Sequence, residues 1–448
     1  MENKIELFSH QKTALALLQA NDAYALFMEQ GTGKTFPILF RLAELAQDRR
    51  ITNALIVAPK AVCKSWKVKI EQLNTEQIQA INSIDLQICS YDIVWRHNDI
   101  TNATFDMVVF DEAHYIKTPS TRRTKACLKL AARAKYKYIL TGTPISNGQL
   151  CNIWSEFTAI DPVVYTSKTN REYIYPACLG GTSYYKWLEE VAVLDRWHKP
   201  VYYRDVNKLQ DIISEHSYRI TKDECLELPE KLPDEILTCE IACKKLYNEL
   251  FTHSTYSDKD YIAENALTRL LKLRQVCSGY FVDSDSKIEK VPCNKIAALK
   301  DLLTDFTDPF VVFCEFTQSI RNVCELLERM DITYVVLNGK SKGDEWKTFQ
   351  ENPNIQAIVC QYASGAAGID LYKASTCIFY EPTLRSELNE QAKDRIHRQG
   401  QHQPCSYYYL ITENSIEQKI YDALCNYQDF TVKIFESYLK SYTKGQKL

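Results

Sequence analysis

Short apolar runs alternate with longer stretches of helical character at both ends of this chain. The runs, each followed by polar residues, are 24–27, 54–58, 107–110 and 138–140 near the N-terminus, and 310–313, 334–337, 357–360 and 376–380 near the C-terminus. Strands that are apolar throughout and separated by helices are typical of parallel sheets covered by helices on both faces. The alternation therefore predicts an α/β protein with two parallel sheets.

The stretch between the two alternating regions has a different composition and pattern. It is rich in tryptophan and tyrosine, has few strand signals, and contains charged segments of helical character. With 448 residues the chain is too long for one ordinary core. We expect a first sheet domain over 1–147, a largely helical insertion over 148–290 and a second sheet domain over 291–448. Parallel sheets bind ligands at the carboxyl ends of their strands.

A glycine-rich segment, EQGTGKT, follows the first apolar run. Its glycines would let backbone N–H groups turn toward phosphate oxygens, Lys34 would reach the β- and γ-phosphates, and Thr35 would offer a hydroxyl to Mg²⁺. The full phosphate-loop pattern also has a glycine at 28, where this chain has Met28. A glycine-rich turn is the alternative. The predicted nucleotide contacts in the segment are Gln30, Gly31, Thr32, Gly33, Lys34 and Thr35.

An acidic segment, VVFDEAH, follows the third apolar run. Asp111 is suited to hold Mg²⁺ through its water shell, and Glu112 to orient and deprotonate an attacking water. A solvated strand end is the alternative for the segment alone. Because both segments follow strands of one predicted sheet, together they predict a site for ATP and Mg²⁺, with Thr35 and Asp111 as the metal-holding residues.

Two weaker signals lie in the same region. Phe8 could stack on adenine and the Gln11 amide could read its edge, although a capped helix start is an alternative. The hydroxyls of Thr141 and Thr143 follow the fourth run and could couple to the acidic segment, as could His114; a plain turn is the alternative for the threonines.

The segment QAKDRIHRQGQ lies about 280 residues after the glycine-rich loop. Arg395 and Arg398 are three apart, which predicts that both project from one helix face, and guanidinium groups fork onto phosphate oxygens. Gln391 beside them is a candidate coupling residue. A small-residue loop that contains Gly368 and Asp370 precedes them and suits contact with a ribose or a phosphate. We expect the arginines to complete the ATP site from the second domain.

The formal charge of −3 gives no global attraction to polyanions, so any nucleic-acid surface must be local. Cations that follow predicted strands are candidates for DNA contacts, although each could be ordinary solvated surface: Lys60, Lys64, Arg122, Arg123 and Lys340. The 16 cysteines show no metal-ligand spacing, no apolar run approaches a membrane span, and no signal peptide is evident. These features predict a cytoplasmic protein without membrane contact.

The ordered set of segments resembles the Swi/Snf-type ATPases of helicase superfamily two over nearly the whole chain. Segments 8–11, 29–35, 55–66, 108–114 and 139–147 resemble the first-lobe motifs, and 311–319, 364–371 and 391–401 the second-lobe motifs. Within the insertion, 147–162, 227–236 and 273–279 resemble segments of this branch.

The resemblance implies two RecA-like lobes and a DNA-dependent ATPase that uses ATP and Mg²⁺ to move on duplex or branched DNA. We expect a minimal, monomeric motor of viral or bacterial type that remodels DNA structures or bound proteins. A strand-separating or branch-migrating helicase remains an alternative that would need a strand-dividing wedge. An inactive DNA-binding scaffold is a third interpretation. It is disfavoured because the predicted catalytic residues are all present: Lys34, Asp111, Glu112, Arg395 and Arg398.

Overall fold

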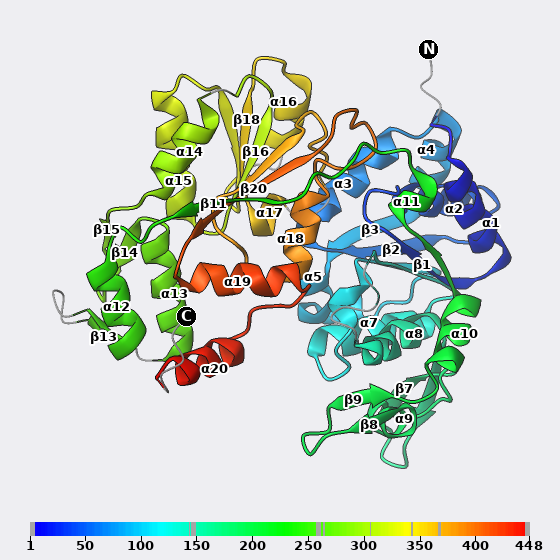
Figure 1. Ribbon diagram of the computed structural model, residues 1–448. Coiled ribbons are helices and arrows are strands. Elements are labelled where there is room, and N and C mark those ends of the chain that lie inside the picture. Colours follow the sequence, from blue (N-terminus) through cyan, green and yellow to red (C-terminus); the bar gives the residue numbers. More distant parts are fainter. Residues whose placement is uncertain are drawn as a thin grey trace. The chain divides into compact units, whose positions relative to one another are not determined.

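Two units make up the computed structural model, Met1–Glu227 and Leu228–Leu448 (Figure 1). The structure describes residues 5–142, 144, 149–256, 261–262, 265–304, 306–341, 344–365 and 369–443. Each unit contains a six-stranded sheet in which every neighbouring pair is parallel. The α/β class and the two parallel-sheet lobes predicted from the sequence are confirmed.

The first sheet has the strand order β10-β1-β5-β4-β2-β3. Its strands are β1 (Ala23–Met28), β2 (Asn53–Ala58), β3 (Asp85–Ser90), β4 (Met107–Asp111), β5 (Tyr136–Leu140) and β10 (Ser217–Ile220). The accompanying helices are α1 (Ser9–Ala20), α2 (Thr35–Gln47), α3 (Lys60–Glu71), α4 (Thr75–Asn82), α5 (Tyr91–Arg96), α6 (Asn98–Asn102), α7 (Arg122–Arg133) and α8 (Ile153–Ile160), with short 3-10 turns η1 (Ala113–Ile116) and η3 (Leu150–Asn152).

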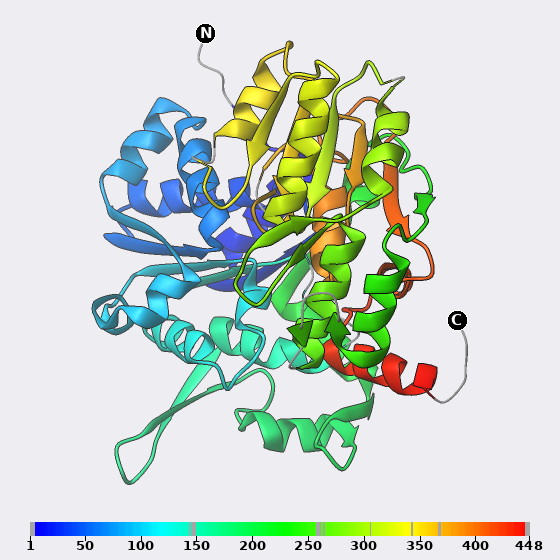
Figure 2. The ribbon, with the colours of Figure 1, turned by 90° about the vertical axis from the view of Figure 1, so that its left-hand side faces the viewer.

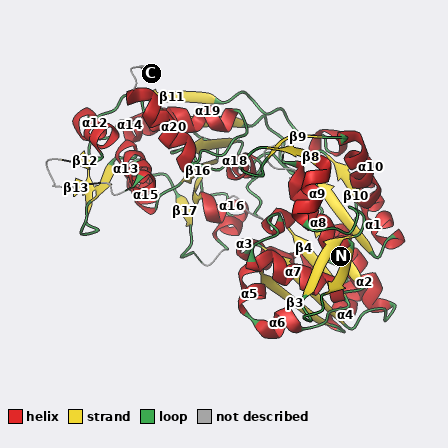
Figure 3. Ribbon diagram, turned by 90° about the horizontal axis from the view of Figure 1, so that it is seen from below, coloured by secondary structure: helices red, strands yellow, loops and turns green. Residues whose placement is uncertain are grey.

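The central strands of this sheet are buried on both faces. Val108, Val109 and Phe110 of β4 are at most 1% exposed. Helices α5, α7 and α8 cover the face that carries Phe27 and Phe110. Figure 3 shows helices on both sides of the yellow strands. Continuous apolar runs form such strands because neither face meets water. The four strands predicted here are confirmed, whereas β3 and β10 were not anticipated.

Two antiparallel hairpins and two helices extend the first unit beyond α8. Strands β6 (Pro162–Thr166) and β7 (Glu172–Pro176) form a hairpin that projects from the unit in Figure 2. Strands β8 (Ala192–Leu194) and β9 (Pro200–Tyr203) form a second hairpin after α9 (Tyr184–Val191). Helix α10 (Val206–His216) then leads into β10 at the sheet edge, and α11 (Lys222–Cys225) follows.

The second sheet has the order β11-β20-β19-β16-β18-β17. Its strands are β11 (Glu235–Cys239), β16 (Phe310–Cys314), β17 (Tyr334–Leu337), β18 (Ala357–Gln361), β19 (Thr376–Phe379) and β20 (Ser406–Thr412). Its helices are α14 (Lys295–Leu303), α15 (Thr317–Arg329), α16 (Glu345–Glu351), α17 (Tyr362–Gly365), α18 (Ser386–Lys393) and α19 (Ile416–Cys425). The four predicted strands are confirmed, and β11 and β20 are additional.

A helical layer completes the second unit. Helices α12 (Lys244–His253), α13 (Ala266–Cys277) and α20 (Val432–Thr443) share an apolar cluster with α19, and short strands β12 (Thr255–Tyr256), β13 (Tyr261–Ile262), β14 (Tyr280–Val282) and β15 (Ile288–Lys290) lie between α12 and α14. Within this unit Lys295 and Glu417 form a fully buried ion pair at 2.7 Å.

The stretch 148–290 therefore differs from the largely helical insertion that we expected. It contains helices, but it also contributes hairpins and one edge strand to each sheet, β10 to the first and β11 to the second. These edge strands are short and half exposed, so they lack the continuous apolar run on which the strand prediction depended. The chain divides after Glu227, inside the predicted insertion.

Among the described residues, no helix has the length and apolar character needed to cross a membrane.

Candidate active site

The glycine-rich loop connects β1 to α2 in the first unit, at the carboxyl end of its strand. Gly31 and Gly33 have φ angles of 88° and 79°, a left-handed region that favours glycine. The hydroxyl of Thr32 donates to the Glu29 carbonyl at 2.7 Å and closes the turn. Lys34 directly precedes α2, at the N-terminus of that helix. The loop thus has the backbone that an anion-binding concavity requires.

Side chains of the first helix hold this loop from the outside. The Gln11 amide donates to the carbonyls of Thr32 and Gly33 at 3.3 and 3.2 Å, and the His10 ring donates from Nε2 to Thr32 at 2.8 Å. The Gln11 oxygen accepts from the Phe8 N–H at 3.0 Å. These bonds engage both ends of the Gln11 amide with its own unit, and the adenine contact of Gln11 stays a prediction. Phe8 is 43% exposed and stays a candidate for base stacking.

The acidic pair lies at the end of the neighbouring strand β4. Lys34 Nζ lies 3.2 Å from Glu112 Oε1, and His114 Nδ1 lies 3.4 Å from Glu112 Oε2. Glu112 has a φ of 54°, so the chain turns sharply where the strand ends. The loop and the acidic segment, separated by about 75 residues in the sequence, meet as predicted.

Asp111 is buried and held in place by two aromatic side chains. Trp66 of α3 donates its indole N–H to Asp111 Oδ2 at 2.8 Å, and the hydroxyl of Tyr91 donates to the Asp111 carbonyl at 2.8 Å. Neither aromatic was predicted as a site residue, and only Trp66 lay in a segment that the sequence singled out. The buried Trp66 therefore orients the carboxylate, whereas the buried Tyr91 fixes the backbone of Asp111.

Burial affects the two carboxyl groups differently. For Asp111, burial and the neighbouring Glu112 charge raise the pKa. For Glu112, burial opposes ionisation, but the Lys34 ammonium and the His114 ring outweigh it and lower the pKa to about 2. Neighbouring carboxyl groups with different pKa values are suited to different roles.

The oxygen atoms of this site fit Mg²⁺. The Thr35 hydroxyl accepts from Lys69 Nζ at 3.0 Å, and Lys69 also favours the ionised form of Asp111. A cationic group therefore contacts Thr35 and acts through its charge on Asp111, the two residues predicted to hold the metal. Hydroxyl and carboxylate oxygens are the hard ligands that Mg²⁺ prefers. Thr35 and Asp111 would hold the ion, and Lys34 with the loop amides would hold phosphate.

Two further segments of the first unit pack against the loop. The N–H of Lys222, which follows β10, donates to Glu29 Oε2 at 2.8 Å, a link that no sequence signal indicated. A Cβ atom on Gly142 would lie 3.1 Å from the Gln30 nitrogen, so the segment after β5 touches the loop. Thr141 is fully buried, and its N–H donates to Leu26. Its coupling role stays a prediction, and Thr143 lies outside the described residues.

The arginines of the second unit converge on one carbonyl group. Arg395 Nη1 donates to the Ile369 oxygen at 3.2 Å and Arg398 Nη1 donates to the same oxygen at 2.8 Å. The predicted helix through both arginines is wrong, because α18 ends at Lys393 and turns follow. Contacts with the loop before them, rather than helical spacing, bring the two guanidinium groups together.

The two arginines differ in their surroundings. Arg395 is 4% exposed and also donates to the Gln391 carbonyl, whereas Arg398 pairs with Asp370 at 2.5 Å. Asp370 thus pairs with Arg398 in this structure, and its contact with the nucleotide stays a prediction. The predicted coupling residue Gln391 is buried, and its amide donates to the Glu387 carboxylate. The predicted nucleotide contact Gly368 lies outside the described residues.

Other polar residues of the segment 391–401 have architectural contacts. Asp394 pairs with Lys231 at 3.1 Å, and the His397 ring donates from Nε2 to the Pro229 carbonyl at 2.8 Å. These contacts attach the strand-like stretch before β11 to the arginine segment.

The cations predicted to contact DNA are not equivalent. Lys60 and Lys64 of α3, Arg122 of α7 and Lys340 after β17 are exposed. Arg123 is half-buried and pairs with Asp92 at 2.9 Å, so it also has a structural role. Lys340 belongs to the second unit and the others to the first.

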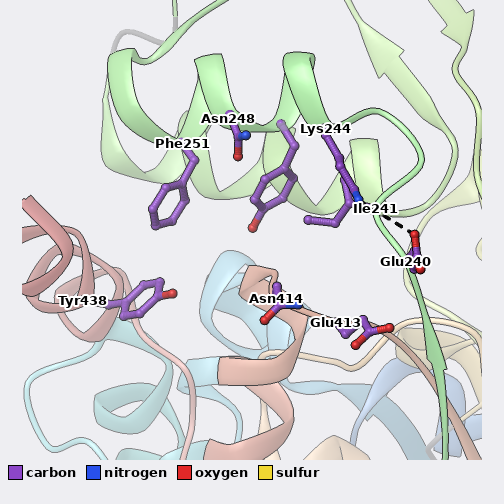
Figure 4. A pocket seen from close by; sticks show the side chains of 9 residues that line it. Glu240, Ile241, Lys244, Asn248, Phe251, Glu413, Asn414 and Tyr438 are labelled. Carbon is purple, nitrogen blue, oxygen red and sulfur yellow. Dashed lines mark ion pairs between the residues drawn. The ribbon is translucent and has the colours of Figure 1, made fainter. Parts of the chain in front are cut away.

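A separate pocket of about 370 Å³ lies in the second unit (Figure 4). Its lining comes from α12, α20 and the segments around Glu240 and Glu413, with Tyr247, Phe251 and Tyr438 as the aromatic side chains. None of the predicted site residues lines it, so we do not assign the nucleotide to this pocket.

Two parallel-sheet units, a glycine loop with an adjoining acidic pair, and paired arginines define the helicase superfamily two class. The chain matches the family described as SNF2-related domain over residues 10–281 and the family described as helicase conserved C-terminal domain over 294–400. The chain therefore belongs to the SNF2-related family, as its resemblance indicated.

Relatives and solved structures of this kind are similar over most of the chain. An uncharacterized ATP-dependent helicase of Mycoplasma genitalium is 27% identical over 88% of this chain and 38% of its own length. A probable ATP-dependent DNA helicase of Arabidopsis thaliana is 25% identical over 98% of this chain and 43% of its own. The chain thus spans about two fifths of such relatives. A Sulfolobus solfataricus SWI2/SNF2 ATPase core in complex with dsDNA is 21% identical, covers 98% of this chain and 94% of that one, and has a TM-score of 0.43.

Proposed function

We propose that this protein is a DNA-dependent ATPase that couples hydrolysis to movement along duplex or branched DNA. The observation that carries the proposal is the contact network of Lys34, Glu112 and His114 beside the buried Asp111. It supplies a phosphate-binding cation, a base and a metal-holding carboxylate at the carboxyl edge of one sheet. Family membership and the names of the relatives support DNA as the partner.

In the proposed reaction, the loop amides and Lys34 bind the β- and γ-phosphates of ATP. Glu112 orients a water molecule and accepts its proton while the oxygen attacks the γ-phosphorus. The bond between the γ-phosphorus and its bridging oxygen breaks, which yields ADP and phosphate. Mg²⁺ held by Thr35 and Asp111 would neutralise charge on the phosphate oxygens.

Lys34 has two possible partners in this scheme. In the structure its ammonium pairs with Glu112, and phosphate oxygens would compete for the same group. Transfer of Lys34 to the phosphates would remove the ammonium from Glu112 Oε1 and leave His114 as the remaining partner of the carboxylate, which favours uptake of a proton. The base would thus become available when the substrate binds.

Arg395 and Arg398 would stabilise the charge that develops on the transferred phosphate. An arginine in this role is worth about 10³–10⁵ in hydrolysis rate. Because these residues belong to the second unit and Lys34 to the first, hydrolysis would require residues of both units. This shared dependence would couple hydrolysis to movement along DNA.

Comparison of ATP hydrolysis across DNA substrates tests the proposal. Turnover is measured without DNA and with single-stranded DNA, duplex and four-way junctions, together with displacement of an annealed strand. We expect duplex or junction DNA to stimulate turnover. Absence of stimulation by every DNA would refute the motor function, whereas displacement of a simple annealed strand would favour a strand-separating helicase. Affinity for DNA should also fall steeply with salt, because phosphate contacts release counterions.

A further inference from the structure

A highly exposed tryptophan lies at the tip of the β8–β9 hairpin in the first unit. We call residues Asp195–Lys199, which join the two strands, the Trp197 loop. Trp197 is 69% exposed, the highest value among the exposed large apolar residues of the described chain. Exposing this much of a tryptophan costs solvation free energy, and tryptophans of this kind are enriched where ligands bind.

The backbone of the Trp197 loop is fixed by its own hydrogen bonds. Asp195 Oδ1 accepts from the N–H groups of Trp197 and Lys199 at 2.8 and 2.9 Å. The Asp195 N–H donates to the Lys199 carbonyl at 2.8 Å, and the His198 N–H donates to the Asp195 carbonyl at 3.0 Å. The ring is therefore presented from a closed turn, which lowers the entropy cost of binding.

The base of the hairpin is anchored in the core of the unit. Ala192 at the start of β8 is 1% exposed, and Trp187 of the preceding helix is 2% exposed. The hydroxyl of Tyr203 at the end of β9 accepts from the Cys151 N–H at 3.0 Å. Figure 1 shows the hairpin at the outer end of the first unit, beyond α8. The structure thus combines a buried base with an exposed tip.

Charge around the ring identifies the class of ligand. Arg196, His198 and Lys199 are exposed and flank the ring on both sides in the sequence. The only carboxylate of the loop, that of Asp195, already accepts two backbone N–H groups. The loop is thus locally positive in a chain whose formal charge is −3. The Arg196 guanidinium lies 5.2 Å from the Trp197 ring centroid and supplements the aromatic surface with a cation.

We propose that the Trp197 loop binds unpaired bases of DNA, with the ring of Trp197 stacked on a base and Arg196 and Lys199 against the adjoining phosphates. An aromatic ring flanked by cations matches single-stranded nucleic acid, since every base offers a π-face and every linkage a negative charge. Paired bases inside a duplex do not offer these faces. The loop would therefore engage DNA at forks and junctions.

This inference rests on the proposed function only in taking DNA as the partner. The test uses the full chain and its affinity, without nucleotide, for a single strand, a fork with unpaired arms and a blunt duplex of the same sequence. The variants are Trp197→Ala and Trp197→Phe, and the control is Tyr427→Ala, which removes an aromatic ring that is 67% exposed in the second unit. Thermal unfolding checks that each variant folds.

Loss of one stacked base should weaken binding by about 5- to 150-fold. We expect Trp197→Ala to show this loss for the single strand and the fork, with duplex affinity and duplex-stimulated ATP turnover unchanged. Trp197→Phe should retain most of the affinity, and Tyr427→Ala all of it.

Two outcomes would overturn the inference. If Trp197→Ala binds all three DNAs like the wild type, the loop does not contact DNA and a protein partner becomes the better occupant. If it loses duplex affinity to the same extent, the ring does not select unpaired bases. If no DNA stimulates turnover but the single-strand loss persists, the motor function fails and the loop assignment stands.

Discussion

The replacement of Gly33 by alanine tests whether the glycine-rich loop is held in shape by the first helix. Gly33 has a φ of 79°, and a Cβ atom there would lie 2.2 Å from Gln11 Nε2. That distance is far below any contact between non-bonded atoms, so the Gln11 amide would have to move. Its bonds to the carbonyls of Thr32 and Gly33 would then be lost.

The expected cost has two parts. A side chain in the left-handed region costs about 1–2 kcal/mol. The loss of two hydrogen bonds adds about 0.5–1.5 kcal/mol for each bond. Gly33→Ala should therefore lower the free energy of unfolding by about 2–5 kcal/mol. Nucleotide affinity should fall as well, because the backbone N–H groups of the loop would no longer converge on the phosphate.

A matched control separates the two parts. Gly180 is in the same unit with a φ of 90°, and nothing lies within 4 Å of a Cβ atom built there. Gly180→Ala should cost only the backbone strain, about 1–2 kcal/mol. Both variants are compared by urea denaturation, and nucleotide affinity is measured by titration. Gly180→Ala should leave that affinity unchanged.

A double-mutant cycle with Gln11→Ala completes the test. Removal of the Gln11 amide relieves the contact, so Gly33→Ala should cost less in the Gln11→Ala background than in the wild type. Equal losses in both backgrounds, or a loss for Gly33→Ala no larger than that for Gly180→Ala, would show that the amide does not constrain the loop.

Three further predictions concern the acidic segment and the arginine cluster. Glu112→Gln should retain ATP binding and lose turnover; persistent hydrolysis in a steady-state assay would show that the base is misassigned. Arg398→Ala should lower ATP turnover without abolishing nucleotide binding. Asp370→Asn should raise turnover, because it releases the Arg398 guanidinium that Asp370 holds at 2.5 Å. A wild-type rate of turnover in either variant would show that the replaced residue does not influence hydrolysis. Trp66→Phe removes a buried hydrogen bond to a carboxylate, so it should lower the free energy of unfolding by about 1.5–3 kcal/mol. The control is Trp95→Phe, which removes an exposed hydrogen bond to a carboxylate and should lower the free energy of unfolding by about 0.5 kcal/mol. Equal losses for the two variants in urea denaturation would refute this account.

Local patterns were sufficient for the central strands and for the loop between β1 and α2. Runs such as Val108–Phe110 are apolar at every position, and only a strand covered on both faces accommodates them. The order of glycines, lysine and threonine in the loop likewise follows from what a phosphate requires of a backbone. The meeting of Lys34 with Glu112 then follows from the rule that parallel strands present their carboxyl ends at one edge.

Long-range contacts decided what local pattern could not. Gln11 donates to the glycine-rich loop, Trp66 donates to Asp111, and Lys69 donates to Thr35. Arg395 and Arg398 both donate to the Ile369 carbonyl and do not lie along one helix. Each of these contacts joins residues that are distant in the sequence, so no periodicity encodes it.

The edge strands and the Trp197 loop illustrate the same division. The half-exposed strands β10 and β11 form because partners elsewhere in the chain offer unpaired backbone groups. The sequence shows a tryptophan among cations at 196–199, but it cannot tell a buried ring from an exposed one. The sequence by itself determined the fold class and the chemistry of the loop, because these depend on neighbouring residues. Only the tertiary structure decided which side chains bind other parts of the protein and which stay exposed to solvent, because burial is a property of the packed chain.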